Sequence, residues 1–417
     1  MPSETAAISL GAEAAAAGRL LCSAAVRARC RTLFDAGQQD RLAHFRLRLD
    51  RLERCADYVV DTLRAAYPTL AIPYHSRWRH FAVGGRDRWS ALAPRFAGNA
   101  LERARARFDL AIVSVLLDAG AGTRWRYREA AGAEYARSEG LAVASFHLFS
   151  SGALSANASE PLRADADKLA EFTESVLGAE FQVRADNPLT GLAGRAALMQ
   201  RLGAAARAQP EIFGAKRPRL GLLADYLKAQ SLGDTLPAAA ILETLLRVLG
   251  SIWPGRIALG GVPLGDVWRH SQARAGDATD GLVPLHKLSQ WLAYSLVEPL
   301  EELGIVVTGL DGLTGLAEYR NGGLFVDAGV LEPRDAALAR QSLAPDSEPV
   351  VEWRALTVIL LDEIAQLVRA RLDMDASSLP LAKVLEGGTW SAGRRLAHEM
   401  RADGAPPLNV VSDGTVF

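Results

Sequence analysis

The spacing of apolar residues along the chain predicts mostly helices. Between residues 9 and 66 we expect two amphipathic helices, the second lined by Leu42, Phe45, Leu49, Leu52 and Val59. Similar helical patterns cover 98–118, 166–178, 193–208, 221–230, 237–250, 284–303, 352–372 and 381–402. Strand-like patterns are short and occur at 256–259, 305–307 and 324–326. The pattern therefore predicts a mainly α, multi-helix globular fold with a few short β-strands.

One stretch interrupts the helical patterns with the composition of a linker. Residues 153–166 read ALSANASEPLRADA and are rich in serine, alanine and polar residues. We take this stretch as the boundary between an N-terminal helical region, 1–155, and a second helical region, 156–417, that holds the main catalytic candidates. The two regions are expected to pack closely, or to form one domain.

Composition and charge exclude several classes of protein. The net charge of −1 supplies no positive field for a nucleic-acid partner. The N-terminus lacks a basic segment before an apolar core, and no apolar run approaches the length of a membrane span. The cysteines, Cys22, Cys30 and Cys55, have neither disulfide-framework nor zinc-ligand spacing. We therefore expect a cytoplasmic protein that binds a small molecule; its oligomeric state stays open.

The predicted helix at 284–303 carries polar residues of chemical interest. Its buried stripe consists of Leu285, Leu288, Leu292 and Leu296. His286 and Gln290 lie one turn apart on a neighbouring face, and Lys287 lies about 100° further round. A lysine and an imidazole near a helix N-terminus favour anion binding. The alternative is a solvated polar face with a structural histidine.

A segment punctuated by glycines follows this helix. It sets Asp311, the tetrapeptide 318–321 (EYRN) and Asp327 among small residues. A carboxylate in an apolar site has a raised pKa and can act as an acid or base, whereas one beside an arginine stays ionised. The alternative is a structural turn in which the glutamate and arginine pair with each other.

Two further clusters combine charge with aromatic rings or with acids. Arg77, Trp78 and His80 could clamp and stack on a substrate, or form an arginine-rich surface over a core tryptophan. A second cluster favours a buried ion-pair network over catalysis; it contains Arg107, Asp109, Asp118 and the tripeptide Arg137-Ser138-Glu139.

Several motifs of well-known enzymes are missing from the chain. It contains no GxxxxGK[ST] phosphate loop, no GxGxxG between strand and helix, no HExxH and no GxSxG. His75 and His80, five residues apart, do not have helical ligand spacing. We therefore expect neither a cofactor nor a metal.

Many short sequence segments, in the same order along the chain, resemble segments of the uracil-catabolism family often called uracil catabolism protein four. They are HSRWRHF (75–81), RARFDLAIVSVLLDAGAG (105–122), RSEGLAVAS (137–145), NPLTGLAGR (187–195), IWPGR (252–256), LGDVW (264–268), LVPLHKLSQWLAYSL (282–296), LDGLTGLAEYRNGGLFVD (310–327), LPLAKVLEGGTWSAGR (379–394) and SDGTVF (412–417). The resemblance runs from about residue 70 to the end. It implies a place in pyrimidine breakdown linked to ribosylurea, whose cleavage yields ribose, or its phosphate, and urea.

A second resemblance covers about 40 residues. HKLSQWLAYSL followed by LTGLAEYRNGG is similar to a helix and a following segment of the queuosine 5′-phosphate N-glycosylases, which cleave a base from a ribose 5′-phosphate with an aspartate. Lys287 and Gln290 match the helix words, and Glu318-Tyr319-Arg320 falls on that family's Asp-Tyr-Arg. Here the carboxylate is a glutamate, and His286 stands in place of a tyrosine.

Both resemblances imply hydrolysis of an N-ribosyl bond, which passes through an oxocarbenium-like sugar. A carboxylate would stabilise that charge and deprotonate the attacking water. We expect Glu318 in this role, with Asp311 and Asp327 as alternatives. The competing hypotheses are a metal-dependent, amidohydrolase-like opening of a uracil-derived nucleotide, and a non-catalytic scaffold or sensor of the pathway.

The remaining candidates would bind the substrate or assist the leaving group. His286, Tyr319 or Asn321 would polarise the urea, and Lys287 with Arg320 or Arg77 would hold a 5′-phosphate. The other expected substrate-binding residues are Gln290, Trp78 and His80.

Overall fold

The computed structural model describes residues 4–253, 256–411 and 414–415, and they are mainly helical. The expected fold class, many helices with a few short strands, is confirmed. The chain divides into two compact units, each built from separate stretches. The first unit contains residues 1–75, 255–290 and 309–411; the second contains 76–254, 291–308 and 412–417. The linker-like stretch 153–166 lies within the second unit, between two of its helices.

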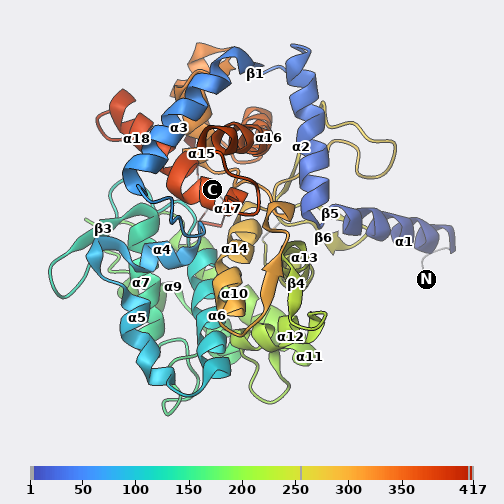
Figure 1. Ribbon diagram of the computed structural model, residues 1–417. Coiled ribbons are helices and arrows are strands. Elements are labelled where there is room, and N and C mark those ends of the chain that lie inside the picture. Colours follow the sequence, from blue (N-terminus) through green and yellow to red (C-terminus); the bar gives the residue numbers. More distant parts are fainter. Residues whose placement is uncertain (1–3, 254–255, 412–413, 416–417) are drawn as a thin grey trace. The chain divides into compact units, whose positions relative to one another are not determined.

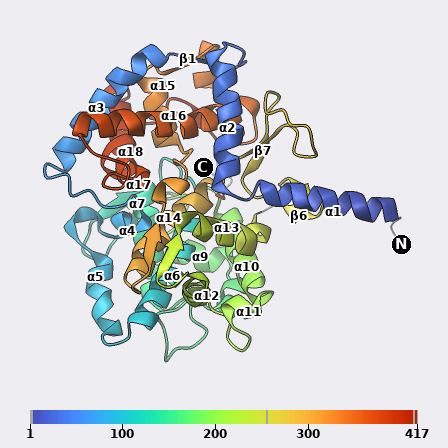
Figure 2. The same cartoon turned by 45° about the vertical axis from the view of Figure 1, so that its right-hand side comes forward.

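In the first unit, helices gather around one long helix, α16 (Glu348–Leu372). Helices α2, α3 and α15 pack against it (Figures 1 and 2). Apolar residues occupy most of α16, so the helix is buried along much of its length. The other helices of this unit are α1 (Glu4–Arg19), α2 (Ser23–Gln38), α3 (Leu52–Ala66), α15 (Tyr319–Asp327), α17 (Leu381–Val384) and α18 (Trp390–Met400), with 3₁₀ turns at Leu49–Arg51, Leu310–Gly312 and Ala336–Arg340 and a π-helical turn at Leu385–Thr389.

The strands of the first unit form two-stranded pairs and no larger sheet among the described residues. Some strand residues, such as Val267 and Leu282, belong to a hydrophobic core cluster. The pairs are β1 (Phe45–Leu47) with β10 (Leu331–Pro333), β5 (Ala258–Leu259) with β6 (Val262–Pro263), β7 (Val267–Arg269) with β8 (Leu282–Pro284), and β11 (Ser342–Leu343) with β12 (Asn409–Val410), the last parallel and the others antiparallel.

The second unit is also built mainly from helices. Its strands are β2 (Arg126–Arg128) paired with β3 (Glu134–Ala136), and β4 (Thr235–Pro237) paired in parallel with β9 (Val306–Thr308). Its helices are α4 (Arg77–Phe81), α5 (Arg88–Leu92), α6 (Ala100–Leu116), α7 (Arg137–Ser150), α8 (Ala166–Ala170), α9 (Glu174–Glu180), α10 (Leu192–Arg207), α11 (Pro210–Phe213), α12 (Leu223–Gln230) and α13 (Ala238–Leu249), with 3₁₀ turns at Val83–Gly85, Ala93–Phe96, Leu220–Leu222 and Gly250–Ile252. The division assigns the first residues of α14 (Lys287–Glu301) to the first unit and the rest to the second.

Several of the predicted elements are wrong. The helix expected at 166–178 is divided into α8 and α9, and the helix expected from residue 284 begins at Lys287, after strand β8. Residues 9–66 hold three helices and a strand instead of two helices, because the chain pairs Phe45 with Pro333 rather than continuing a helix. The expected strand at 324–326 is part of helix α15. A Leu-Phe-Val run is compatible with either element, and here the capping residue before it and the helices packed on it select the helix.

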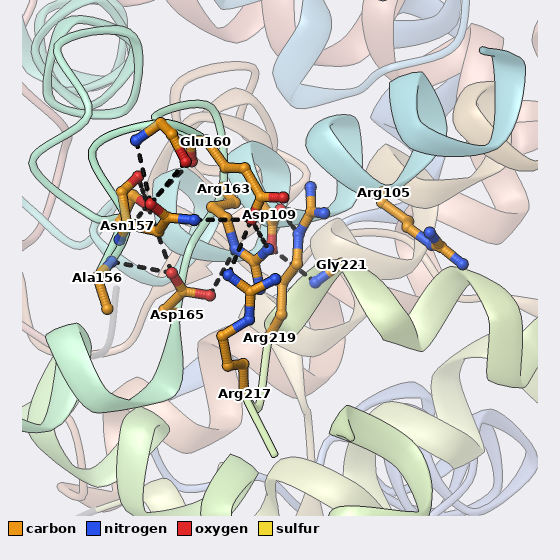
Figure 3. A network of polar contacts seen from close by, with 12 residues as sticks. Arg105, Asp109, Ala156, Asn157, Glu160, Arg163, Asp165, Arg217, Arg219 and Gly221 are labelled. Atoms are coloured by element: carbon orange, nitrogen blue, oxygen red, sulfur yellow. Dashed lines mark hydrogen bonds and ion pairs between the residues drawn. The ribbon is translucent and has the colours of Figure 1, made fainter. Parts of the chain in front are cut away.

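The second unit contains a buried ion-pair network around Asp109 (Figure 3). Asp109 accepts hydrogen bonds from Arg219 Nε at 2.7 Å and from the Gly221 N–H at 2.6 Å. Burial raises the pKa of Asp109 to about 6, and the Arg219 cation counteracts the rise. A Cβ on Gly221 would collide with the Arg105 carbonyl, so only glycine permits this approach. Asp109 therefore belongs to a structural network, as the sequence favoured.

None of the helices in the part of the chain described here combines the length and the apolar character that crossing a membrane requires.

Replacing Asp109 by alanine should lower the free energy of unfolding by about 3–5 kcal/mol, because it leaves the buried Arg219 cation without its main partner. Urea denaturation followed by circular dichroism measures the change. Asp186, which pairs with Arg184 in an exposed position, provides the control, and Asp186→Ala should leave the midpoint unchanged. Equal midpoints for both variants would show that the network does not stabilise the fold.

Candidate functional site

Glu318 starts helix α15. Its side chain accepts hydrogen bonds from the backbone N–H groups of Arg320 and Asn321, at 2.7 and 2.6 Å. These N–H groups lie at the positive end of the helix and have no partner within it. Glu318 is therefore fixed by capping, with its carboxylate at the start of α15 and only 7% of the residue exposed.

Glycines allow α15 to approach its neighbours closely. A Cβ on Gly322 would lie 2.7 Å from the Trp353 ring, whose Nε1–H donates to the Gly322 carbonyl at 3.0 Å. A Cβ on Gly393 would collide with the Arg320 carbonyl. These contacts pack α15 against α16 and α18, so the glycines near 322 and 393 have a structural reason.

A second carboxylate, Asp266, holds the start of α14. It accepts a hydrogen bond from the Lys287 N–H at 2.8 Å and from Trp268 Nε1 at 2.5 Å. Arg354 binds it through two nitrogens, at 2.9 and 2.7 Å. Burial disfavours the Asp266 anion, but Arg354 keeps the pKa of this carboxyl well below its usual range. Asp266 therefore stays ionised and serves as a fixed anchor.

Arg354 connects the starts of the two helices. Besides Asp266, its guanidinium donates through Nε to the carbonyl of Ala317, the residue before Glu318, at 3.2 Å. The side chain lies in the middle of α16 and is buried. One arginine thus positions both the Asp266 end of α14 and the Glu318 end of α15.

Lys287 and Glu318 form the charged part of the candidate site. Burial raises the pKa of Glu318, and the Lys287 ammonium acts against that rise together with the two capping N–H groups. Lys287 is itself only 7% exposed. A buried carboxylate whose pKa is raised, with a cation in its field, is suited to act as an acid or base.

His286 directly precedes α14 rather than lying on it, and Gln290 lies in the first turn of the helix. The His286 Nε2 is 3.0 Å from the Leu20 carbonyl, and the Gln290 N–H donates to the His286 carbonyl at 2.8 Å. Burial lowers the pKa of His286, so the ring is neutral. Because a carbonyl only accepts, Nε2 carries the ring proton and Nδ1 is an acceptor. In this state His286 can polarise an N–H group but has no proton to give from Nδ1.

The side chains of Tyr319, Arg320 and Asn321, which follow Glu318, make different contacts. Asn321 is committed to the fold: it accepts from Thr389 Oγ1 at 2.8 Å and donates to the Leu316 carbonyl at 3.2 Å. Arg320 donates to the Gly404 carbonyl at 3.0 Å and stacks over the Tyr319 ring at 5.0 Å. Thr389 ends the π-helical turn, and such turns are frequent at functional sites.

The two alternative carboxylates are each engaged in an ion pair. Asp311 pairs with Arg369 at 2.5 Å and accepts from the Leu381 N–H at 2.6 Å, beside a surface hollow of about 360 Å³. Asp327 binds Arg401 through both oxygens, at 2.8 and 2.5 Å. Asp327 also ends α15, about 13 Å along the helix axis from Glu318. Glu318 is instead held by backbone N–H groups, and burial raises its pKa.

Arg77 and His80 belong to a buried cluster of the second unit. Arg77 donates to Ser114 Oγ at 2.6 Å and to Asp118 Oδ1 at 2.8 Å. Ser138 Oγ donates to Asp118 at 2.8 Å and lies 3.1 Å from His80 Nδ1. This cluster has the ion-pair character that the sequence suggested for Asp118.

Trp78 is a core residue of the second unit. Its Nε1–H donates to the Ser295 carbonyl at 2.8 Å, and the Arg107 guanidinium lies 3.8 Å from the ring centroid. The indole N–H and the ring of Trp78 therefore both have partners within the second unit.

The sequence did not single out Arg354, which connects Asp266 to the start of α15. A signal for Arg354 exists, because it is a lone cation in the apolar helical run VVEWRALTVILL. Its partner could not be read from the pattern, since 88 positions separate the two residues.

Within residues 4–253, 256–411 and 414–415, no group of three or more His, Cys, Asp or Glu side chains is arranged to hold a metal ion. The cysteines Cys22, Cys30 and Cys55 are free thiols.

Comparison with known proteins identifies relatives along nearly the whole chain. The family model described as "Protein of unknown function (DUF1688)" matches residues 19–417. "Uracil catabolism protein 4" of Lachancea kluyveri is 39% identical over 428 residues, which cover 94% of this chain and 97% of that protein. "Protein urg3" of Schizosaccharomyces pombe is 38% identical over 411 residues, which cover 96% of this chain and 98% of that protein. The family resemblance inferred from the sequence words is confirmed.

The neutral state of His286 predicts a pH-dependent contribution to stability. Its folded pKa lies below the ordinary value of 6.5, so the contribution is complete above that pH and is lost as the pH falls through the folded pKa. Between about pH 8 and about pH 5, the melting temperature of the wild type should fall more than that of His286→Gln, which cannot be protonated. His398→Gln, at an exposed position, should follow the wild type. Parallel curves for wild type and His286→Gln would contradict the neutral, buried imidazole.

Proposed function

This chain belongs to the DUF1688 family, and from that membership we propose that it is a hydrolase of uracil catabolism. The proposed reaction is cleavage of the N-ribosyl bond of ribosylurea, or of its 5′-phosphate, with release of urea. The name of the relative "Uracil catabolism protein 4" supports the pathway. Support for the type of reaction comes from the geometry around Glu318.

The observation that carries the proposal is a buried carboxylate in the field of a buried cation. Glu318 sits at the start of α15 with a raised pKa, and Lys287 lies close enough to act on it electrostatically. Cleavage of an N-ribosyl bond develops positive charge on the sugar ring. A carboxylate fixed by two backbone N–H groups can face that charge without having to reorganise during the reaction.

In the proposed reaction, the oxygen of a water molecule bonds to the anomeric carbon while the bond from that carbon to the urea nitrogen breaks. The electron pair of the broken bond stays on the nitrogen. Glu318 takes a proton from the water, and an equivalent proton is delivered to the urea nitrogen. The products are ribose, or ribose 5-phosphate, and urea; nothing is oxidised or reduced.

Other residues would bind the substrate around this carboxylate. Lys287, with Arg320, supplies positive charge for a 5′-phosphate. Tyr319, which is half-buried beside Arg320, is the candidate for protonating the leaving group, since the amide of Asn321 is engaged with Thr389 and Leu316. Arg77 and His80 stay predictions for ligand binding in the second unit.

Glu318→Gln should reduce urea release from ribosylurea by about 10²–10⁴-fold, because the amide cannot accept the proton of the attacking water. The glutamine keeps an oxygen that can cap α15, so the fold should persist. Asp87→Asn neutralises another capping carboxylate, which accepts from the Ser90 N–H, and should leave activity unchanged. The measurement is free urea from purified protein, with circular dichroism as the check on folding.

Full activity of Glu318→Gln would refute the assignment of this residue. An assay with and without a chelator distinguishes the proposal from a metal-dependent ring opening, in which the chelator stops turnover. Absence of urea with both the free and the phosphorylated substrate would support the scaffold or sensor hypothesis instead.

Lys287→Ala should raise KM for ribosylurea 5′-phosphate by about tenfold or more, since a hydrogen bond to a charged group contributes ~1.5–3 kcal/mol. KM for unphosphorylated ribosylurea should change little, so the second substrate is the internal control. Kinetics are compared at a pH where Glu318 stays ionised in both proteins, because removing the ammonium raises the pKa of Glu318 further. An equal rise in KM for both substrates would show that Lys287 does not bind the phosphate.

A further inference from the structure

The start of α14 has two buried polar atoms, one on the residue before the helix and one in its first turn, that lack a partner among the residues the structure describes. They are Nδ1 of His286 and Nε2 of Gln290. His286 is 1% exposed and Gln290 is 0% exposed. A buried polar atom without a hydrogen bond costs about 1–3 kcal/mol, so two of them four residues apart need an explanation.

The hydrogen bonds that these side chains do make define their chemistry. His286 Nε2–H donates to the Leu20 carbonyl at 3.0 Å, which leaves Nδ1 as a lone-pair acceptor. Gln290 Oε1 accepts from the Thr314 N–H at 3.3 Å, which fixes the orientation of the amide and leaves its two N–H donors on Nε2. The pair therefore offers one acceptor and one donor group, both neutral.

The backbone holds this arrangement at an energetic cost. His286 has a φ of 49°, in the left-handed region that non-glycine residues rarely adopt. The Asp266 carbonyl accepts from the N–H groups of Leu285 and His286, at 2.9 and 3.3 Å. Strain of this kind persists where the surrounding structure fixes it, and it often occurs at binding sites.

We propose that His286 and Gln290 bind a ureido unit, with its carbonyl oxygen accepting from Gln290 Nε2 and its N–H donating to His286 Nδ1. A phosphate or carboxylate has no N–H to donate and would meet the lone pair of Nδ1, so an anion does not fit this pair. The ureido unit can be that of an open-chain urea or that of a uracil ring, since both present an N–H beside a C=O. The identity of the substrate as ribosylurea rests on the proposed function, but the binding chemistry does not require turnover.

The test measures binding by isothermal titration calorimetry in the full chain carrying Glu318→Gln, which slows hydrolysis. The ligands are ribosylurea, uridine and ribose, and only the first two contain a ureido unit. We expect at least one of these two to bind about tenfold more tightly than ribose, and the tighter of the two identifies the source of the ureido unit.

Gln290→Met, added to this background, removes the donor while keeping a side chain of similar size. It should weaken the tighter ureido ligand by about tenfold and leave ribose unchanged. The matched control is Gln200→Met, because the Gln200 amide already donates to the Phe172 carbonyl at 2.7 Å. Equal binding of ribose and both ureido ligands, or equal weakening of all ligands by Gln290→Met, would overturn the proposal.

A spectroscopic measurement remains decisive if Gln290→Met does not fold. In the Glu318→Gln chain labelled with ¹⁵N-histidine, His286→Gln assigns the two ring nitrogens of His286. We expect Nδ1 to be unprotonated in the free protein and to shift when the ureido ligand binds, but not with ribose. A protonated Nδ1 in the free protein would refute the site. If the ureido ligand binds as described but the wild type releases no urea, the proposed hydrolysis fails while the binding site stands.

Discussion

The pairing of Arg354 with Asp266 is the interaction on which the candidate site depends. Arg354 projects from the middle of the apolar helix α16, where an unpaired cation would be very costly. It satisfies this requirement with a two-point bond to Asp266 and a bond to the Ala317 carbonyl. Because Asp266 also holds the first N–H of α14, and Ala317 precedes Glu318, this one side chain sets where both helices begin.

Asp266 and Glu318 show how environment separates two carboxylates of similar position. Each accepts backbone N–H groups at the start of a helix and each is buried. Asp266 has a guanidinium in direct contact, so its pKa is lowered and it stays an anion. At Glu318, burial outweighs the capping bonds and the positive charges of Lys287 and Arg320, so the pKa of this carboxyl is raised. When the environment shifts the pKa values of two acids in opposite directions, the acid with the lowered pKa has a structural role and the one with the raised pKa can exchange protons.

Three other aspartates of the candidate clusters have structural roles. Asp109, Asp311 and Asp327 each pair with an arginine, and Asp109 and Asp311 also accept a backbone N–H from a helical turn. A chain so rich in arginine forms many such pairs, so a carboxylate in the sequence says little about function by itself. The segment 286–290 differs from these ion pairs, because the side chains of His286 and Gln290 are neutral and buried, and each has a polar atom without a hydrogen bond among the described residues. Unsatisfied neutral groups point to a ligand more clearly than satisfied charges do.

The sequence by itself determined the helical character of the chain, because the 3.6-residue spacing of apolar positions is a local property. It also placed Lys287, Gln290 and Glu318 among the candidates through their motifs. It could not separate helix from strand at 324–326, where the short apolar run fits both and the packing of α15 decides. Nor could it give the charge states: Arg354 reaches Asp266 across 88 positions, and the tautomer of His286 follows from a carbonyl 266 positions away. Such contacts depend on the whole folded path of the chain, so only the tertiary structure decides them.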